Sequence, residues 1–387
     1  MVAAVDDVVI LDNGAYSVKV GTSRDEEPRI VPNCIFKAKS EKKRVFVGTE
    51  IDDCADKSGI YYTYSCEKGY IVNYDVQQQI WDRALADYLP DARNSKLVMT
   101  DLNYLIPAIK DQSFEIIFEE FEFGKLHKSS APAFSSLSSD SAALVIDCGF
   151  SCTTVSAFFE GQPIKNATIR IDLGGKTLTN QLKDWISFRE INVMEETYVV
   201  NECKEDCCFV SLNFEKDLEI ARLGQGKNTI RRDYVLPDFS DLMRGYIRGE
   251  DEKVEGSVIR MNLERFMIPE ALFSPSNLLM DQMGVAEAAA EVISRCPKNM
   301  RYSLASNIVV TGGSTKFPNF TERLKTELDS MLGEYSASEF LPVADPLTHA
   351  WTKAREAAKG LEFVSRGEYA EHGADAIAKR FINFVDN

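Results

Sequence analysis

The sequence has little histidine, no long apolar run and a deficit of basic residues. Its histidines are His127, His349 and His372, which lie far apart and do not suggest a clustered metal site. No apolar run approaches the roughly 20 residues that cross a bilayer, so we expect no membrane contact. The first residues, MVAAVDDVVILD, lack a basic segment, and we expect no secretory signal. The formal charge of −16 disfavours a protein that binds nucleic acid by itself.

Nine cysteines are present, but they show no paired spacing, which favours reduced thiols in the cytosol or nucleus. The densest group is CKEDCC, which contains Cys203, Cys207 and Cys208. A metal site there would need further ligands, so we expect buried structural thiols. The short basic run KAKSEKKR at 37–44 is interpreted as a solvated loop, with a nuclear signal as the alternative. The length of 387 residues allows two domains or one large bilobed body.

An acidic pattern occurs twice in the chain. VVILDNGAYSVKV at 8–20 and AALVIDCGFSCTTVSAF at 142–158 both place an aspartate after an apolar strand, with glycine two positions later. Asp12 and Asp147 therefore occupy matching places, and the Asn-Gly pair after Asp12 predicts a hairpin because both residues tolerate positive φ. Two such units, far longer than solenoid repeats, indicate a duplicated α/β fold. Taken alone, the aspartate at the first turn is better explained as a turn former.

Segments with a 3.6-residue apolar period separate the strands and predict helices over 111–121, 177–188, 284–296 and 319–332. The expected buried side chains are Phe114, Ile117, Phe118 and Phe121 in the first helix, Leu178, Leu182 and Trp185 in the second, and Phe320, Leu324, Leu328 and Met331 in the last. Asn319 is the expected N-cap of the last helix. Strands that alternate with helices indicate an α/β architecture.

A third turn, NIVVTGGSTKFPNF at 307–320, runs from a β-branched strand into Gly312 and Gly313 and then into a helix. Glycines at such a junction let a ligand approach the backbone, and the helix N-terminus favours an anion. Together with the two acidic hairpins, this junction predicts a nucleotide cleft between two lobes.

At these residues the sequence resembles actin and the actin-related proteins. LDNGAYSVKVG and VIDCGFSCTTV resemble the family's two phosphate hairpins, and IVVTGGSTKFP resembles its adenosine-side loop. RFMIPEALFSPS at 265–276 and the segment at 46–81 resemble further family segments in the right order. The resemblance implies an α/β, actin-like two-lobed fold with duplicated ribonuclease-H-like cores and a nucleotide cleft between them.

The resemblance also implies four subdomains. Subdomain 1 would comprise 1–33, 65–137 and 349–387, and subdomain 2, with a shortened polymerisation loop, would comprise 34–64. Subdomain 3 would comprise 138–171 and 262–348, and subdomain 4 would comprise 172–261.

Carried over by position, the resemblance implies a site for ATP or ADP with Mg²⁺, with an empty cleft as the alternative. Asp12 and Asp147 would hold the cation through water, Lys19 would meet the phosphates, and Glu205 would reach the ribose. The implied nucleotide-binding residues are Asp12, Asn13, Gly14, Lys19, Asp147, Gly149, Gly175, Lys204, Glu205, Gly312 and Gly313.

The residues that support hydrolysis depart from the family pattern. Ala15 and Tyr16 replace a serine and a glycine in the first hairpin, and Phe150 and Ser151 replace an aspartate and a glycine in the second. KSSAPAFSSLSSDSA at 128–142 contains no hinge glutamine. Phosphoryl transfer depends on such positioning groups, and each loss removes about 2–4 kcal/mol of transition-state stabilisation. We therefore expect no catalytic residues and a pseudo-ATPase.

DYVLPDFS at 233–240, PNC at 32–34 and DNGAY resemble a nuclear branch of the family. Its members are nuclear subunits of ATP-dependent chromatin remodelling complexes that deposit a variant histone, and we expect this chain to be a non-catalytic structural subunit that serves as an interaction platform. This implies a location in the nucleus, and also the cytoplasm, with a remodeller motor subunit and a zinc-finger subunit as partners and the nucleosome reached through the complex.

Two alternatives stay open beside that interpretation. The alternative function is that of a slow actin-like ATPase whose nucleotide state switches lobe closure. The second open question concerns a loop, which is either a partner-docking site or a self-packed loop and contains Leu236, Pro237 and Phe239. Since 33–46 is short and charged, we expect no filament formation.

Overall fold

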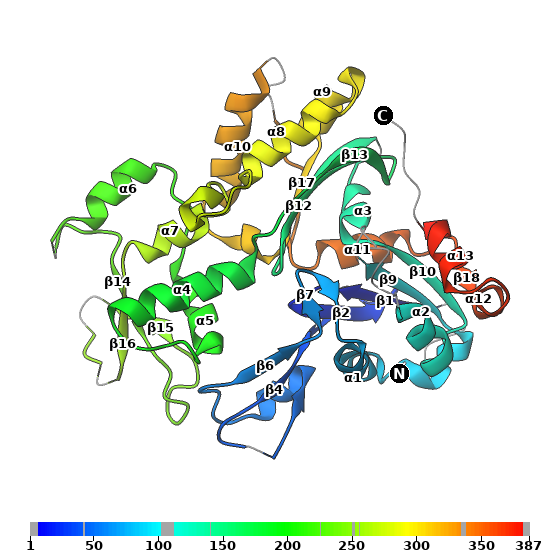
Figure 1. Cartoon of the computed structure of the whole chain (residues 1–387), viewed down its shortest axis with the longest axis horizontal. Helices are drawn as coiled ribbons and strands as arrows, with labels where there is room; N and C mark the ends of the chain where they lie inside the picture. The colour runs from blue at the N-terminus through cyan, green and yellow to red at the C-terminus, as the bar shows by residue number, and fades with distance from the viewer. Residues whose placement is uncertain are drawn as a thin grey trace.

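The computed structural model describes residues 7–41, 43–101, 112–139, 141–224, 226–249, 252–254, 256–333 and 338–381. The molecule has two lobes, and the two largest sheets form their centres (Figure 1). In the described ranges no helix has the length and apolar character that a membrane span needs.

The first lobe contains a six-stranded sheet of order β18-β10-β9-β1-β2-β3. The strands are β1 Val8–Asn13, β2 Ser17–Thr22, β3 Arg29–Pro32, β9 Lys96–Asp101, β10 Lys125–Ser130 and β18 Val364–Ser365. β1, β2 and β3 are antiparallel neighbours, whereas β9 runs parallel to β1 on its other side. The run from Val8 to Leu11 is buried on both faces of the sheet, which explains why it is continuously apolar.

The second lobe repeats this arrangement in a four-stranded sheet of order β13-β12-β11-β17. The strands are β11 Ala142–Cys148, β12 Thr153–Phe159, β13 Gln162–Ile171 and β17 Ile308–Thr311. β11, β12 and β13 are antiparallel neighbours, and β17 runs parallel to β11. The duplication predicted from the two acidic patterns is thereby confirmed.

Smaller sheets lie beyond the two large ones. Their strands are β4 Cys34–Lys37, β5 Phe46–Val47, β6 Tyr61–Tyr64, β7 Cys66–Glu67, β8 Tyr70–Ile71, β14 Arg232–Val235, β15 Tyr246–Ile247 and β16 Val258–Met261. The sheet β5-β4-β6 falls within the range expected for subdomain 2, and β15-β14-β16 falls within that for subdomain 4. The exact subdomain boundaries stay predictions.

Helices pack on the sheets and between them. They are α1 Tyr74–Leu85, α2 Ser113–Glu115, α3 Ala131–Ser136, α4 Gly175–Arg189, α5 Thr197–Cys207, α6 Phe214–Ala221, α7 Glu264–Glu270, α8 Val285–Arg295, α9 Lys298–Ser306, α10 Phe320–Leu332, α11 His349–Ala357, α12 Arg366–His372 and α13 Ala374–Ala378. Short 3₁₀ turns cover Gly48–Asp53, Leu89–Asn94, Pro275–Leu278, Gly313–Lys316 and Lys379–Phe381. α3 contacts both large sheets, and α11 packs on α3 and on the sheet of the first lobe, so the two helices join the lobes.

The predicted helices are present, with three differences. The helix expected over 111–121 begins at Ser113 and continues as a π-helical turn over Ile116–Glu120, while residue 111 lies outside the described residues. Met331 was expected in the core but is 48% exposed near the end of α10. Asn319 lies at the N-cap position, but its side chain donates to the Val210 carbonyl instead of capping α10.

Candidate functional site

A cleft of about 520 Å³ lies where the two acidic hairpins meet the turn after β17. Its lining also includes the first residue of α4 and part of α5. Every residue that the sequence analysis assigned to nucleotide binding lines it: Asp12, Asn13, Gly14, Lys19, Asp147, Gly149, Gly175, Lys204, Glu205, Gly312 and Gly313. The fold therefore gathers at one place residues that are widely separated in the chain.

Asp12 is held firmly at the end of β1. It lies directly across the hairpin from Lys19 on β2, and its Oδ2 is 3.1 Å from the lysine Nζ. The Thr100 hydroxyl of β9 donates to its other oxygen, Oδ1, at 2.7 Å. Because both oxygens have partners, this carboxylate tolerates its burial at 4% exposure.

Asp147 occupies the equivalent place at the end of β11. In the described part of the chain it has no hydrogen-bond or ion-pair partner. Burial, and then the charge of Asp12, raise the pKa of Asp147 to about 6, while the charge of Lys19 lowers it. The two carboxylates therefore interact electrostatically across the cleft.

These groups fit a divalent cation. An unpartnered carboxylate destabilised by a second carboxylate gains most from a positive charge between them. Mg²⁺ is bound in proteins through one or two carboxylates while it keeps several waters, which matches the oxygen groups of Asp12 and Asp147.

The first hairpin turn differs from the prediction in its geometry. Neither Asn13 nor Gly14 adopts a positive φ, so the reason given for an Asn-Gly turn is wrong. Glycine is needed at 14 because a Cβ would lie 2.8 Å from the Ser17 carbonyl oxygen and 2.9 Å from the Lys19 Nζ. The Asn13 Oδ1 accepts from the indole of Trp81 at 3.1 Å, so this side chain fastens the hairpin to α1.

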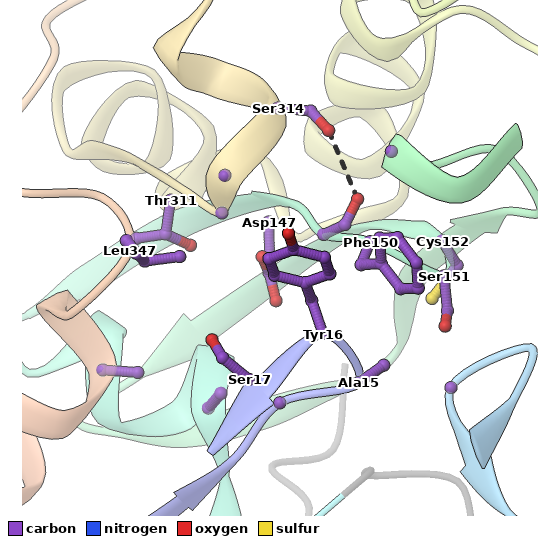
Figure 2. Close-up of a pocket in the computed structure, with 18 of the residues that line it drawn as sticks. Ala15, Tyr16, Ser17, Asp147, Phe150, Ser151, Cys152, Thr311, Ser314 and Leu347 are labelled. Carbon is purple, nitrogen blue, oxygen red and sulfur yellow. Dashed lines mark hydrogen bonds between the residues drawn. The ribbon is translucent and has the colours of Figure 1, made fainter. Parts of the chain in front are cut away.

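The glycines of the second lobe permit close packing of its loops. Gly312 has a φ of 92°, and a Cβ there would lie 2.4 Å from the Cys148 carbonyl oxygen. The Gly149 carbonyl accepts from the Gly175 backbone at 3.0 Å and from the Ser314 hydroxyl at 3.3 Å (Figure 2). These contacts connect the second acidic hairpin, α4 and the turn after β17, which together form one side of the cleft.

Lys204 is engaged with its own lobe. Its ammonium donates to the Thr179 hydroxyl at 2.8 Å, to Asn201 Oδ1 at 2.9 Å and to the Gly175 carbonyl at 3.3 Å. Burial lowers the pKa of Lys204. Glu205 accepts from Asn201 Nδ2 at 2.8 Å. Lys204 thus fixes α5 against α4 where a nucleoside would lie.

The departures from the family pattern also line the cleft. Ala15, Tyr16, Phe150 and Ser151 form the facing tips of the two acidic hairpins (Figure 2). α3 contributes Ala131 and Pro132 to the lining, with Ser130 just before it. The described lining contains neither glutamine nor histidine.

Sequence reasoning missed two threonines. Thr100 bonds Asp12, and Thr311 is the register partner of Asp147 on the neighbouring parallel strand. The signal was present, because VMT at 98–100 and VVT at 309–311 both end apolar strands. The internal repeat therefore extends beyond the hairpins to the strand beside each of them.

Asn33, quoted only as part of PNC, was also missed. It is fully buried, and its backbone N–H donates to the Tyr16 carbonyl at 2.9 Å. Its Nδ2 donates to the Gly14 carbonyl at 2.9 Å. Asn33 therefore fixes the first turn, and nothing in the local sequence indicates that role.

The segment predicted for partner docking is half-buried. Leu236 packs against the core of the second lobe, and Pro237 and Phe239 are partly covered. Backbone N–H groups donate to Asp238 and lower the pKa of its carboxyl to about 2. This geometry agrees with a self-packed loop.

All nine cysteines are buried and unpaired, which confirms the expectation of buried thiols. Burial raises the pKa of Cys208, and it also raises the pKa of Cys152 to about 11. The thiolate is the reactive form, so these groups are inert near neutral pH.

The repeated sheet, the two facing acidic hairpins and the cleft between them define an actin-type fold. The family model described as "Actin" matches residues 4–382, and the chain belongs to the actin family. Within the family, relatives called actin-related protein 6 match nearly the whole chain.

One such relative, from Drosophila melanogaster, is 37% identical over 395 residues, covering 96% of this chain and 99% of the relative. The Arabidopsis thaliana protein of the same name is 33% identical over 420 residues, covering 97% and 99%. An actin-like protein of Caenorhabditis elegans is 46% identical over 386 residues, covering 97% and 92%. These similarities confirm the resemblance to the actin-related proteins.

Proposed function

We propose that this protein is a non-catalytic, actin-like platform subunit of a nuclear chromatin remodelling complex that deposits a variant histone. One observation supports the proposal that the protein is not catalytic. The tips of the phosphate hairpins present Ala15, Tyr16 and Phe150, which supply apolar and aromatic groups where phosphoryl transfer needs polar donors. The likeness to relatives named actin-related protein 6 supports the assignment to a complex.

In this proposal the cleft binds ATP or ADP with Mg²⁺ as a structural ligand. Asp12 and Asp147 hold the hydrated cation, Lys19 meets the phosphates, and Gly312 and Gly313 lie beside the nucleoside. A ligand that binds only the folded chain stabilises it by mass action, whether or not it is hydrolysed. The partners are a motor subunit and a zinc-finger subunit, and the nucleosome is reached through them.

Two measurements test the state of the cleft. Denaturing the purified protein and separating the released nucleotide by chromatography shows whether ATP, ADP or nothing is bound. Single-turnover hydrolysis should show no turnover above that of Asp12→Ala and Asp147→Ala variants. Actin-like turnover that both variants abolish would contradict the non-catalytic assignment.

The assignment to a complex is tested separately. The tagged protein, purified from nuclei at moderate salt, should be recovered with a motor subunit and a zinc-finger subunit. Recovery only as a free monomer would contradict it.

A slow ATPase that switches lobe closure is the second candidate. It is favoured by the intact arrangement of Asp12, Lys19 and Asp147 in the cleft. The single-turnover comparison above separates the two candidates, because only the second expects both aspartates to be required for product formation.

A further inference from the structure

An aromatic contact joins the two lobes at the tips of the acidic hairpins. The ring of Tyr16, from the first hairpin, lies 4.9 Å from the ring of Phe150, from the second (Figure 2). Phe150 also contacts Tyr64 of β6, with ring centroids 5.7 Å apart. A side chain of the second lobe is thus placed between two tyrosines of the first.

This aromatic contact extends away from the cleft. Tyr64 stacks on Tyr62 at 5.6 Å with nearly parallel planes, and Tyr62 meets the edge of Phe36 at 5.7 Å. Phe36 is fully buried in the small core of the β5-β4-β6 sheet. The contact to Phe150 is therefore anchored in a packed cluster, because Tyr62 and Tyr64 also pack on that core.

The backbone around Tyr16 is held by a network of buried amide side chains. Asn33 bonds the carbonyls on both sides of Ala15, those of Gly14 and Tyr16. Gln77 of α1 donates to Asn33 Oδ1 at 3.0 Å and accepts from the Ser65 hydroxyl at 2.8 Å. These buried amides hold the turn in the shape that presents the Tyr16 ring to the other lobe.

Tyr16 also reaches α5. Asn201 Nδ2 lies 3.4 Å from the Tyr16 hydroxyl, at the outer limit of a hydrogen bond. At the rim of the cleft, Glu195 pairs with Lys39, and Glu196 accepts from the Gly59 backbone at 2.9 Å. Lys39 and Glu195 are exposed, and such a pair contributes little, whereas the Gly59–Glu196 bond is partly buried. The aromatic contact at the hairpin tips adds a direct link between the two acidic hairpins.

We propose that the Tyr16–Phe150 contact holds the two lobes closed without a bound nucleotide. If the hairpin tips carried only small and charged residues, the phosphates and cation of a ligand would be needed to connect the two acidic hairpins. In this protein the rings of Tyr16 and Phe150 connect the two hairpins directly. The inference goes beyond the proposed function, since it concerns the nucleotide-free protein and holds whether or not a nucleotide binds.

The test measures the distance between the lobes by pulsed electron paramagnetic resonance. Tyr61→Cys on β6 and Phe188→Cys on α4 provide label sites, since these residues are 73% and 96% exposed. The native cysteines are all buried and do not compete for the label. Nucleotide is removed with EDTA and apyrase, and Mg-ATP or Mg-ADP is added back.

We expect one narrow distance distribution for the nucleotide-free protein, unchanged by either nucleotide. Tyr16→Ala or Phe150→Ala should broaden and lengthen it, while Tyr16→Phe, which keeps the ring, should not. The matched control is Tyr302→Ala, which removes a 66% exposed tyrosine of α9 far along the chain from either hairpin. If Phe150→Ala fails to fold, Phe150→Leu provides the comparison, because it keeps apolar volume without the ring.

Two results would overturn the inference. One is a nucleotide-free wild-type protein with a broad distribution that narrows only on adding nucleotide. The other is a Tyr16→Ala, Phe150→Ala double variant that stays closed. A double-mutant cycle on the unfolding equilibrium constant should also show coupling of about 2- to 10-fold between the two rings.

Discussion

At the scale of single residues, the two cleft carboxylates are chemically different. Asp12 is neutralised by Lys19 and bonded by Thr100, whereas Asp147 has no such partner among the described residues. The same residue type at matching places of a duplicated fold is thus paired with a lysine in the first lobe and has no such partner among the described residues in the second. Their environments, and not their sequence motifs, make the difference.

Asp147→Asn should stabilise the cation-free protein at neutral pH. The folded-state pKa of Asp147 is raised from 3.8 to about 6, so the folded protein binds the proton more tightly than the unfolded chain does. Its contribution to stability is present below about pH 4 and is lost as pH rises through about 6. We expect the variant to gain about 1–3 kcal/mol at pH 7.5, a range that allows for partial exposure, and little at pH 4.

Urea unfolding in EDTA at both pH values measures this gain. Asp12→Asn is the matched control and should have the opposite sign, because it leaves the Lys19 ammonium buried beside a neutral group. Equal destabilisation by both substitutions would contradict the assigned difference between the two aspartates.

At the scale of elements, glycines fix how closely the cleft loops approach each other. Gly312 and Gly313 are adjacent, yet their surroundings differ. A Cβ on Gly312 would overlap the Cys148 carbonyl, whereas one on Gly313 would have Leu347 at 3.9 Å as its nearest neighbour. Only the first glycine is therefore required by the backbone.

Gly312→Ala should lower the free energy of unfolding by at least about 1–3 kcal/mol, the cost of a side chain in that backbone region. Its φ of 92° and ψ of 149° belong to a region used almost only by glycine. Gly313→Ala is the matched control and should change stability by less than about 1 kcal/mol. Chemical denaturation of the two variants measures these changes. Equal losses of unfolding free energy would contradict a special backbone requirement at Gly312.

Leu279, after the 3₁₀ turn Pro275–Leu278, shows strain outside the cleft. It is 97% exposed and has a φ of 59°, a left-handed conformation unfavourable for leucine. Leu279→Gly should raise the free energy of unfolding by about 0.5–1 kcal/mol, because it removes strain without removing buried area. Thermal melts of the variants measure this gain. Leu279→Ala keeps the left-handed strain and should show no increase in the free energy of unfolding.

At the scale of the whole molecule, two lobes meet over one cleft and are joined by α3 and α11. The small β5-β4-β6 sheet of the first lobe ends in a short connection between β4 and β5. Its apolar residues Phe36 and Phe46 are buried, which leaves charged side chains such as Lys39 and Arg44 at the surface. A charged surface of this kind is a poor contact between subunits of a filament.

We accordingly predict that the protein stays monomeric with Mg-ATP. Sedimentation velocity at increasing concentration should give one species of about 43 kDa. Pelletable polymer under actin-polymerising conditions would contradict the prediction. A parallel run at high salt screens the net charge of −16, and the protein should stay monomeric there too if charge repulsion is not what keeps the monomers apart.

Much of the site was predictable because it is encoded in short, repeated patterns. An apolar strand followed by Asp-x-Gly located both aspartates, and the strand before Gly312 located the third turn. The helices at 177–188 and 284–296 followed from their apolar period. The turn geometry at Asn13 and Gly14 was not predictable, because the three-residue turn is fixed by Asn33, which lies between β3 and β4.

The sequence by itself determined the duplicated α/β plan, the two acidic hairpins and the Gly312–Gly313 turn, because alternation, periodicity and glycine placement act over a few neighbouring positions. Gly175, Lys204 and Glu205 were assigned only through the resemblance to the family. Only the tertiary structure decided that Tyr16 meets Phe150, that Thr100 satisfies Asp12, and that no residue in the described part of the chain bonds Asp147. Those outcomes depend on side chains brought together by sheet register and lobe packing, over separations at which sequence patterns carry no distance information.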